Sequence, residues 1–178
     1  MGLISGSPLR TRRAIHDLYS DAMEKARESI IIETPYFVPT KKLMRKMLKK
    51  LKQGISVKIV VADSNSSDIP SLNLVSYYYL APLLRAGAKV YFCTYKNKIL
   101  HAKLFVVDNY VTIVGSSNLD SRSFKYNYEI NTVIFNKEFA KTTIEKIKKD
   151  MLDSKPFDEK IIHQLSFKEK ILSNIYWL

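Results

Sequence analysis

The chain has 178 residues, 46% of them apolar, and its 29 Lys+Arg against 17 Asp+Glu give a formal net charge of +12. This length and composition support one folded domain with a substantial core and exclude disorder of the whole chain. A single cysteine excludes a disulfide scaffold and a cysteine-ligated zinc site, and the apolar runs are too short for a membrane span or a signal peptide, so we expect a soluble or peripheral intracellular protein.

Helical and extended patterns alternate in the first part of the chain. Residues 9–28 carry apolar side chains at helical spacing, and the β-branched run Ser29–Thr34 predicts a buried strand. Thr40 is a typical N-cap for a helix over Lys41–Gln53, and a second strand is expected over Ser56–Ala62. This alternation favours a sheet covered by helices.

The next segments change from helical to mainly extended. Residues 71–86 have helical character, which we expect to be interrupted at Pro82 because proline removes a helical hydrogen bond. A tight turn at Asp108-Asn109 separates two later extended runs. We predict strands over Ala88–Thr94, Lys103–Val107, Val111–Val114 and Glu129–Phe135. Their close spacing after residue 100 indicates antiparallel pairing, and hence a mixed sheet.

The last part of the chain is mostly helical in pattern. Residues 137–152 read as a charged amphipathic helix, and Pro156 marks a break before further helical pieces. We therefore expect an α/β domain over residues 1–153, with a mixed β-sheet flanked by helices on both faces, and a C-terminal helical tail over residues 154–178.

Basic residues are concentrated at the front of the chain. Residues 1–60 carry 13 Lys+Arg and five acids, a net charge of +8. A polyanionic partner, either nucleic acid or an anionic membrane, is one interpretation, and a general preference for lysine is the other. The segment Lys41–Lys52 has seven basic residues and no acid. It can lie on anionic lipid headgroups, or it can be a solvated helix whose apolar stripe packs on the sheet.

Three aromatic groups have two interpretations each. Tyr36 and Phe37 follow a strand, at a position where α/β sheets place binding loops, so they form a pocket rim or have a structural role. The run Tyr77-Tyr78-Tyr79 either lines a binding site or belongs to the core and its rim. The terminal residues 175–178, Ile-Tyr-Trp-Leu, can anchor at a membrane interface or dock on a protein surface.

The residues with the clearest chemistry lie between positions 100 and 131. His101 and Lys103 are two apart at the start of a predicted strand, so they share a face, which suits two groups directed at a phosphate. The small and amide side chains of Gly115-Ser116-Ser117-Asn118 permit close approach of an anion. Glu129 offers a carboxylate that can orient an imidazole.

These residues form the pattern H-x-K-x4-D-x6-G-S-x-N, complete in His101, Lys103, Asp108, Gly115, Ser116 and Asn118. The pattern resembles the signature of the phospholipase D superfamily, and residues 30–39, 83–91 and 115–129 resemble the C-terminal half of bacterial cardiolipin synthases. The run of Asn118, Asp120, Arg122, Ser123, Asn127 and Glu129 is similar to the lipid-acting branch rather than to the small nucleases. The resemblance implies a phospholipase D-like half-domain.

The resemblance also implies a mechanism. His101 would attack the substrate phosphorus and form a phosphohistidine, while Lys103, Asn118 and Ser116 would hold the non-bridging oxygens. Glu129 would hydrogen-bond the far nitrogen of His101. Asp108 completes the catalytic set, with a role centred on the turn. No metal and no cofactor is implied.

Members of this family use two such motifs, whereas this sequence has one, because neither His16 nor His163 lies in an H-x-K pattern. The chain is then a self-pairing homodimer, a fragment lacking an N-terminal half, or an inactive remnant. The resemblance implies a phosphatidyl transferase acting on phosphatidylglycerol, peripheral on the cytoplasmic side of the cell membrane. A metal-independent endonuclease acting as a homodimer is the alternative, and nucleic acid is the less favoured partner.

Overall fold

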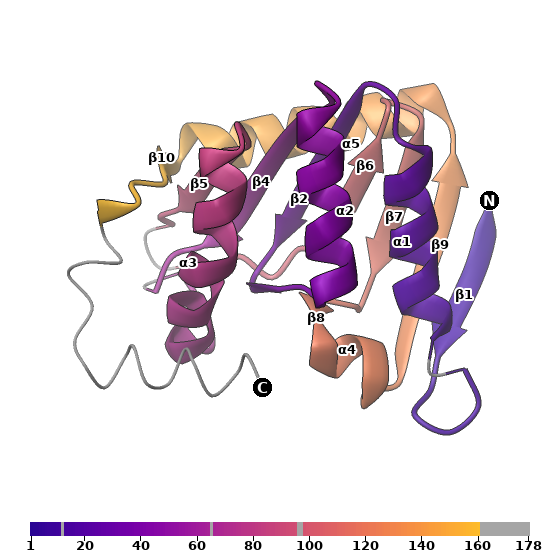
Figure 1. Ribbon diagram of the computed structural model, residues 1–178. Coiled ribbons are helices and arrows are strands. Elements are labelled where there is room, and N and C mark those ends of the chain that lie inside the picture. Colours follow the sequence, from indigo (N-terminus) through magenta and orange to yellow (C-terminus); the bar gives the residue numbers. More distant parts are fainter. Residues whose placement is uncertain (12, 65, 96–97, 161–178) are drawn as a thin grey trace.

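A mixed sheet with helices on both faces forms the described part of the chain, which comprises residues 1–11, 13–64, 66–95 and 98–160 of a computed structural model (Figure 1). The strands are β1 (Gly2–Gly6), β2 (Ser29–Thr34), β3 (Phe37–Val38), β4 (Ser56–Ala62), β5 (Lys89–Cys93), β6 (Leu104–Val107), β7 (Val111–Gly115), β8 (Leu119–Asp120), β9 (Glu129–Phe135) and β10 (Ser154–Pro156). The helices are α1 (Ala14–Lys25), α2 (Lys41–Lys52), α3 (Pro70–Arg85), α4 (Ser121–Lys125) and α5 (Lys137–Leu152).

The main sheet has the strand order β1-β9-β7-β6-β2-β4-β5-β10, and β3 and β8 form a small second sheet. The pairs β2–β4 and β4–β5 are parallel, because a helix returns the chain between their strands. The remaining pairs of the main sheet are antiparallel. Helices α1, α2 and α3 cover one face and α5 lies on the other (Figure 1), which confirms the predicted fold class.

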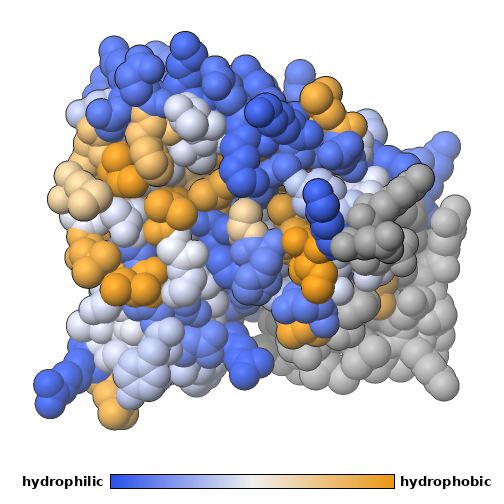
Figure 2. Space-filling view, turned by 180° about the vertical axis from the view of Figure 1, so that it is seen from behind, coloured by the Kyte–Doolittle hydropathy of each residue, from blue (hydrophilic) through white to orange (hydrophobic). Residues whose placement is uncertain are grey.

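Strand β2 is buried on both sides, which explains its unbroken β-branched run. Ile30 and Ile32 belong to the core beneath α1, α2 and α3, whereas Ile31 packs in the smaller core beneath α5. The α5 side of the outer strands is less covered, and Figure 2 shows hydrophobic residues gathered there. Leu3 of β1 and Ile130 of β9 are among the exposed large hydrophobic residues.

Helix α3 differs from the prediction because it continues through Pro82. The proline lies in the last turn, so one helical hydrogen bond is lost close to the helix end, where little helix remains to be disturbed. Leu80, Ala81 and Leu83 are all buried around it. Their packing offsets the missing hydrogen bond, and the expected interruption at Pro82 is wrong.

The two edge strands were also not predicted. Residues 2–6 form β1, which pairs with β9, so the first helix begins at Ala14 rather than near residue 9. Residues 154–156 form β10 on the edge of β5, and Phe157 is buried against Tyr77. The start of the predicted helical tail therefore belongs to the sheet. The terminal aromatic cluster and His163 lie outside the described residues.

A buried polar cluster joins β2 to α5. Glu33 has no exposed surface, and its Oε1 lies 3.9 Å from the Lys146 ammonium, which is 2.8 Å from the Asp150 carboxylate. The Tyr95 hydroxyl donates a hydrogen bond to Asp150. Burial, followed by the charge of Asp150, raises the pKa of Glu33 to about 7. Glu33 thus retains a proton in the folded protein at pH values where it loses that proton in the unfolded chain.

We expect Glu33→Gln to change how stability depends on pH. The folded pKa lies above the ordinary value of 4.5, so the contribution of Glu33 to the free energy of unfolding is complete below pH 4.5 and is lost as pH rises to about 7. Glutamine carries no charge at any pH, so the variant should gain on the order of 2 kcal/mol over the wild type above pH 7. Urea unfolding across this range measures the effect. The exposed Glu145→Gln on α5 is the control, and equal pH slopes in both variants would contradict the prediction.

Candidate active site

The start of β6, the end of β7 and the start of β9 lie at one edge of the sheet, beside β8 and α4 (Figure 1). Most of the motif residues are in or next to these segments. Strands β6 and β7 are antiparallel, with Leu104 opposite Val114, so the segment entering β6 lies next to the segment leaving β7. Strand β9 begins at the same edge, because Gly115 pairs with Asn131. The site edge, defined by His101, Lys103, Ser116, Asn118 and Glu129, is therefore a product of strand order.

His101 and Lys103 lie in the segment just before β6, so Lys103, predicted as the first residue of this strand, precedes it by one position. The Lys103 ammonium donates a hydrogen bond to the His101 carbonyl oxygen at 2.8 Å. Burial lowers the pKa of Lys103, while the charges of Asp68, Glu129 and Asp120 act in the opposite direction. The Lys103 ammonium is thus the positive charge that this part of the site offers to an anion, and the three carboxylates partly oppose the effect of burial on its pKa.

Glu129 is buried and is held by two side chains. The Ser116 hydroxyl donates to Glu129 Oε2, and the Asn127 amide donates to Oε1 at 3.2 Å. Ser116 Oγ also accepts from the Ile130 N–H at 3.0 Å. The expected hydrogen bond between Glu129 and His101 is not made among the residues that the structure describes. Glu129 acts on the site through its charge, which opposes the lowering of the Lys103 pKa by burial.

The turn after β7 aims Asn118 at the site edge. The Asn118 N–H donates to Ser123 Oγ at 3.2 Å, and Asp120 caps α4 by accepting from the Ser123 N–H at 2.6 Å. Burial raises the pKa of Asp120, and the hydrogen bonds that Ser123 makes to the Asp120 carboxylate oppose this shift. Within the described ranges, the buried Oδ1 of Asn118 has no hydrogen-bond partner. This oxygen is an acceptor, so a phosphate oxygen would have to be bound by the N–H groups of the Asn118 amide.

Asp108 lies away from the site edge, at the opposite end of β6. Its carboxylate accepts hydrogen bonds from the N–H groups of Arg27, Glu28 and Ser29 at 2.9, 2.8 and 2.9 Å. Asp108 and Asn109 have φ values of 52° and 51°, and Tyr110 N–H bonds Val107 O, which together make a type I′ hairpin turn. The structure therefore gives Asp108 a structural role and separates it from the other catalytic candidates.

Two residues that sequence reasoning did not assign to catalysis complete the site edge. Asp68, from the loop between β4 and α3, has its Oδ2 3.9 Å from His101 Nε2. Tyr36, which follows β2, is buried, and its hydroxyl donates to Asp68 Oδ1. The polar character of residues 63–68 was visible in the sequence, but only the fold brings this loop to His101. Tyr77 and Tyr79 are buried in the core.

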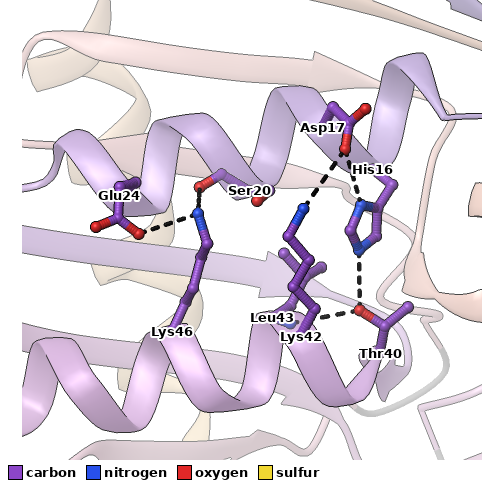
Figure 3. A network of polar contacts seen from close by, with 8 residues as sticks. All are labelled: His16, Asp17, Ser20, Glu24, Thr40, Lys42, Leu43 and Lys46. Carbon is purple, nitrogen blue, oxygen red and sulfur yellow. Dashed lines mark hydrogen bonds and ion pairs between the residues drawn. The ribbon is translucent and has the colours of Figure 1, made fainter.

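His16 has a structural position in the junction of α1 and α2 (Figure 3). Its Nε2 lies 3.0 Å from Thr40 Oγ1, and this threonine caps α2 as predicted by accepting from the Leu43 N–H. The imidazole also contacts the ring of Phe124 edge-on, with centroids 5.5 Å apart. Among the described residues, no group of three or more His, Cys, Asp and Glu is arranged to hold a metal ion.

A cavity of about 220 Å³ lies between α5 and strands β2 and β4, lined by Ile31, Lys58 and Ile144 among others. None of the site-edge residues lines it. The candidate site is therefore separate from this cavity.

Comparisons with known proteins agree with the motif. Residues 19–151 match the family described as "Cardiolipin synthase, PLD-like domain". The chain is 34% identical over 157 residues to the major cardiolipin synthase ClsA of Bacillus subtilis, which covers 88% of this chain and 32% of that protein. It is 32% identical over 176 residues to cardiolipin synthase 1 of Bacillus anthracis, covering 97% and 33%. The chain spans about a third of the length of these curated relatives.

Solved structures share the fold. Nuc from Salmonella typhimurium, a phospholipase D family member, superposes with a TM-score of 0.72 at 21% identity, covering 88% of this chain and 97% of that one. Phosphatidylserine synthase from Haemophilus influenzae superposes with a TM-score of 0.77 at 19% identity, covering 98% and 44%. The same unit is therefore found both as almost a whole chain and as less than half of one.

Proposed function

The chain belongs to the cardiolipin synthase branch of phospholipase D-like domains, and from this premise we propose that it transfers a phosphatidyl group between phosphatidylglycerol molecules. The observation that supports this proposal is the convergence of an imidazole, an ammonium, a hydroxyl, an amide and a carboxylate at one sheet edge. A phosphate diester is the substrate group that such a set can bind and attack.

The proposed reaction has two steps. First, a ring nitrogen of His101 attacks phosphorus, a nitrogen–phosphorus bond forms, and the bond to the glycerol headgroup oxygen breaks as a second imidazole gives that oxygen a proton. Next, a headgroup hydroxyl of another phosphatidylglycerol attacks the same phosphorus, gives its proton to the second imidazole, and releases His101. Lys103, Ser116 and Asn118 stabilise the non-bridging oxygens in both transition states.

The second imidazole is proposed to come from another phospholipase D-like unit. A two-fold axis at the site edge would place two copies of His101 around one phosphate. In a homodimer of this chain, the second His101 comes from the partner subunit. Alternatively, an N-terminal half of the enzyme, separate from this chain, supplies an equivalent histidine. In either case a lone monomer should be inactive.

To test this proposal, the purified chain is incubated with phosphatidylglycerol vesicles and, in parallel, with single-stranded DNA, each with and without EDTA. Light scattering measures the mass of the chain in solution. Cardiolipin or phosphatidic acid formation that persists in EDTA is expected. Cleavage of DNA without lipid turnover would replace this proposal by the nuclease alternative. Loss of activity in EDTA would contradict the metal-free mechanism, and an active monomer would contradict the pairing of two motifs.

We further propose that α2 holds the protein on the cytoplasmic surface of an anionic membrane. Its apolar residues Leu43 and Met47 are fully buried in the core, so the helix cannot insert into lipid. Its other side exposes five basic side chains, those of Lys41, Lys42, Arg45, Lys49 and Lys52. Each such charge contributes about 1 kcal/mol near an anionic surface. No helix in the described ranges is long and apolar enough to cross a bilayer.

Reversing two of these charges, as Arg45→Glu with Lys52→Glu, should weaken vesicle binding at least about tenfold, because it replaces attraction by repulsion. Co-sedimentation with phosphatidylcholine vesicles, with and without phosphatidylglycerol, measures the effect. Lys137→Glu with Lys141→Glu on α5 changes net charge equally and is the matched control. Vesicle binding that does not weaken as the salt concentration rises would contradict a specific α2 contact. An equal loss of binding in the α2 and α5 double variants would contradict it as well.

A further inference from the structure

Asp68 is the carboxylate that faces the imidazole of His101. Its Oδ2 lies 3.9 Å from His101 Nε2, and the two side chains are 41% and 62% exposed, respectively. His101 lies in a segment outside any strand or helix, so little of its surroundings restrains its side chain. A carboxylate in this position favours imidazole orientations that keep Nε2 close to Asp68 Oδ2.

Tyr36 fixes the carboxylate of Asp68. This tyrosine is 3% exposed, and its backbone is held on both sides, because its carbonyl accepts from Thr34 Oγ1 at 3.0 Å and the next N–H, that of Phe37, donates to Ser76 Oγ at 2.9 Å. Its hydroxyl donates to Asp68 Oδ1, which leaves Oδ2 directed at His101. Burial, followed by Asp68, raises the pKa of Tyr36, so the phenol remains a donor.

Glu129 is already committed elsewhere in this arrangement. Both of its oxygens are used, one by Ser116 and one by Asn127. At the site edge, the carboxylate that faces the His101 imidazole is therefore that of Asp68, and the buried Tyr36 hydroxyl donates to it. The three residues come from three separate segments, after β2, before α3 and before β6.

We propose that Asp68, held by Tyr36, is the positioning residue for His101 in phosphoryl transfer. This inference rests on the proposed function, since it takes His101 as the group that attacks phosphorus. Apo contacts of this kind are often long and shorten when substrate binds. A carboxylate held by a rigid phenol orients the imidazole before substrate arrives, so its main contribution is to kcat rather than to KM.

A double-mutant cycle with Asp68→Asn and Tyr36→Phe tests whether Tyr36 acts on His101 through Asp68. Asp68→Asn should lower kcat for phosphatidylglycerol roughly tenfold with little change in KM, because one charge partner at ion-pair distance is removed. Tyr36→Phe should lower kcat less, and the double variant should match Asp68→Asn alone, because Tyr36 acts only through Asp68. Asp68→Glu should recover part of the loss. The exposed Asp21→Asn on α1 removes the same charge elsewhere and is the control.

Two results would overturn the proposal. Additive losses in the double variant would give Tyr36 a role independent of Asp68, and faster turnover with a lower KM in Asp68→Asn would mean that the carboxylate obstructs the phosphate. The chain has three histidines, so the His101 side-chain resonances can be assigned by comparison with His101→Asn, and their scalar couplings report its rotamers. Rotamer averaging should increase in Asp68→Asn and not in Asp21→Asn. This readout needs no turnover. An inactive wild type that is dimeric by light scattering would contradict the proposed function, while the rotamers still test the inference.

Discussion

Replacing His101 with asparagine should reduce phosphatidylglycerol turnover by about a thousandfold or more. Asparagine can still hydrogen-bond, but it has no ring nitrogen to form the covalent bond to phosphorus, and loss of a nucleophile removes the pathway itself. The His101 side chain is 62% exposed, so the free energy of unfolding should change by no more than about 0.5 kcal/mol. Product formation on vesicles and urea unfolding of the same preparations measure the two effects.

Asp108→Asn provides the contrast within the same motif. The carboxylate accepts three backbone hydrogen bonds at the far end of β6, and charge-assisted bonds of this kind contribute about 1.5–3 kcal/mol each. The variant should lose on the order of 2 kcal/mol of stability and keep most of its turnover per folded molecule. The assignment of a catalytic role to His101 would be wrong if His101→Asn retained turnover. The assignment of a structural role to Asp108 would be wrong if fully folded Asp108→Asn lost turnover as severely as His101→Asn does.

Much of the fold could be predicted from local patterns. The run around Ile30, Ile31 and Ile32 predicts a buried strand, and Thr40 predicts the start of α2, because both patterns depend on neighbouring residues. Strand β1 could not be predicted in this way. Its residue Leu3 is exposed, and the strand exists because β9 offers an unpaired edge. Strand β10 has the same origin, and Pro156 is tolerated there because it lies on an edge strand.

The site likewise contains residues that local spacing predicts and a residue that only the fold brings into contact. The spacing of His101, Lys103, Ser116 and Asn118 predicts their convergence, because an antiparallel hairpin returns its two ends to one place. The same spacing puts Asp108 at the hairpin turn, roughly 16 Å of extended chain from Lys103, where it cannot share the site. Asp68 reaches His101 from 33 positions earlier in the chain. Its contact depends on how the loop after β4 crosses the sheet edge, and no local pattern encodes that path.

Gly115 explains why the motif requires a residue without a side chain at this position. It lies in β7 opposite Asn131 of β9, and a Cβ on Gly115 would collide with Asn131 Oδ1 and the Ile130 carbonyl oxygen and lie 2.7 Å from Asn131 Cα. Two of these three contacts are with backbone atoms, which cannot rotate away. The strands would have to separate where Ser116 N–H bonds Ile130 O at 3.0 Å, which is also where Ser116 meets Glu129.

Gly115→Ala should therefore lower the free energy of unfolding by about 3 kcal/mol or more and abolish turnover in the molecules that remain folded. The matched control is Gly2→Ala in β1, where an added Cβ meets nothing within 4 Å. Urea unfolding and vesicle turnover measured on both variants separate loss of strand pairing from a general effect of replacing glycine by alanine in a strand. If Gly115→Ala unfolds like the control, the close approach of β7 and β9 does not limit stability. If Gly115→Ala also keeps its turnover, the role of Ser116 in the site does not depend on the close approach of β7 and β9.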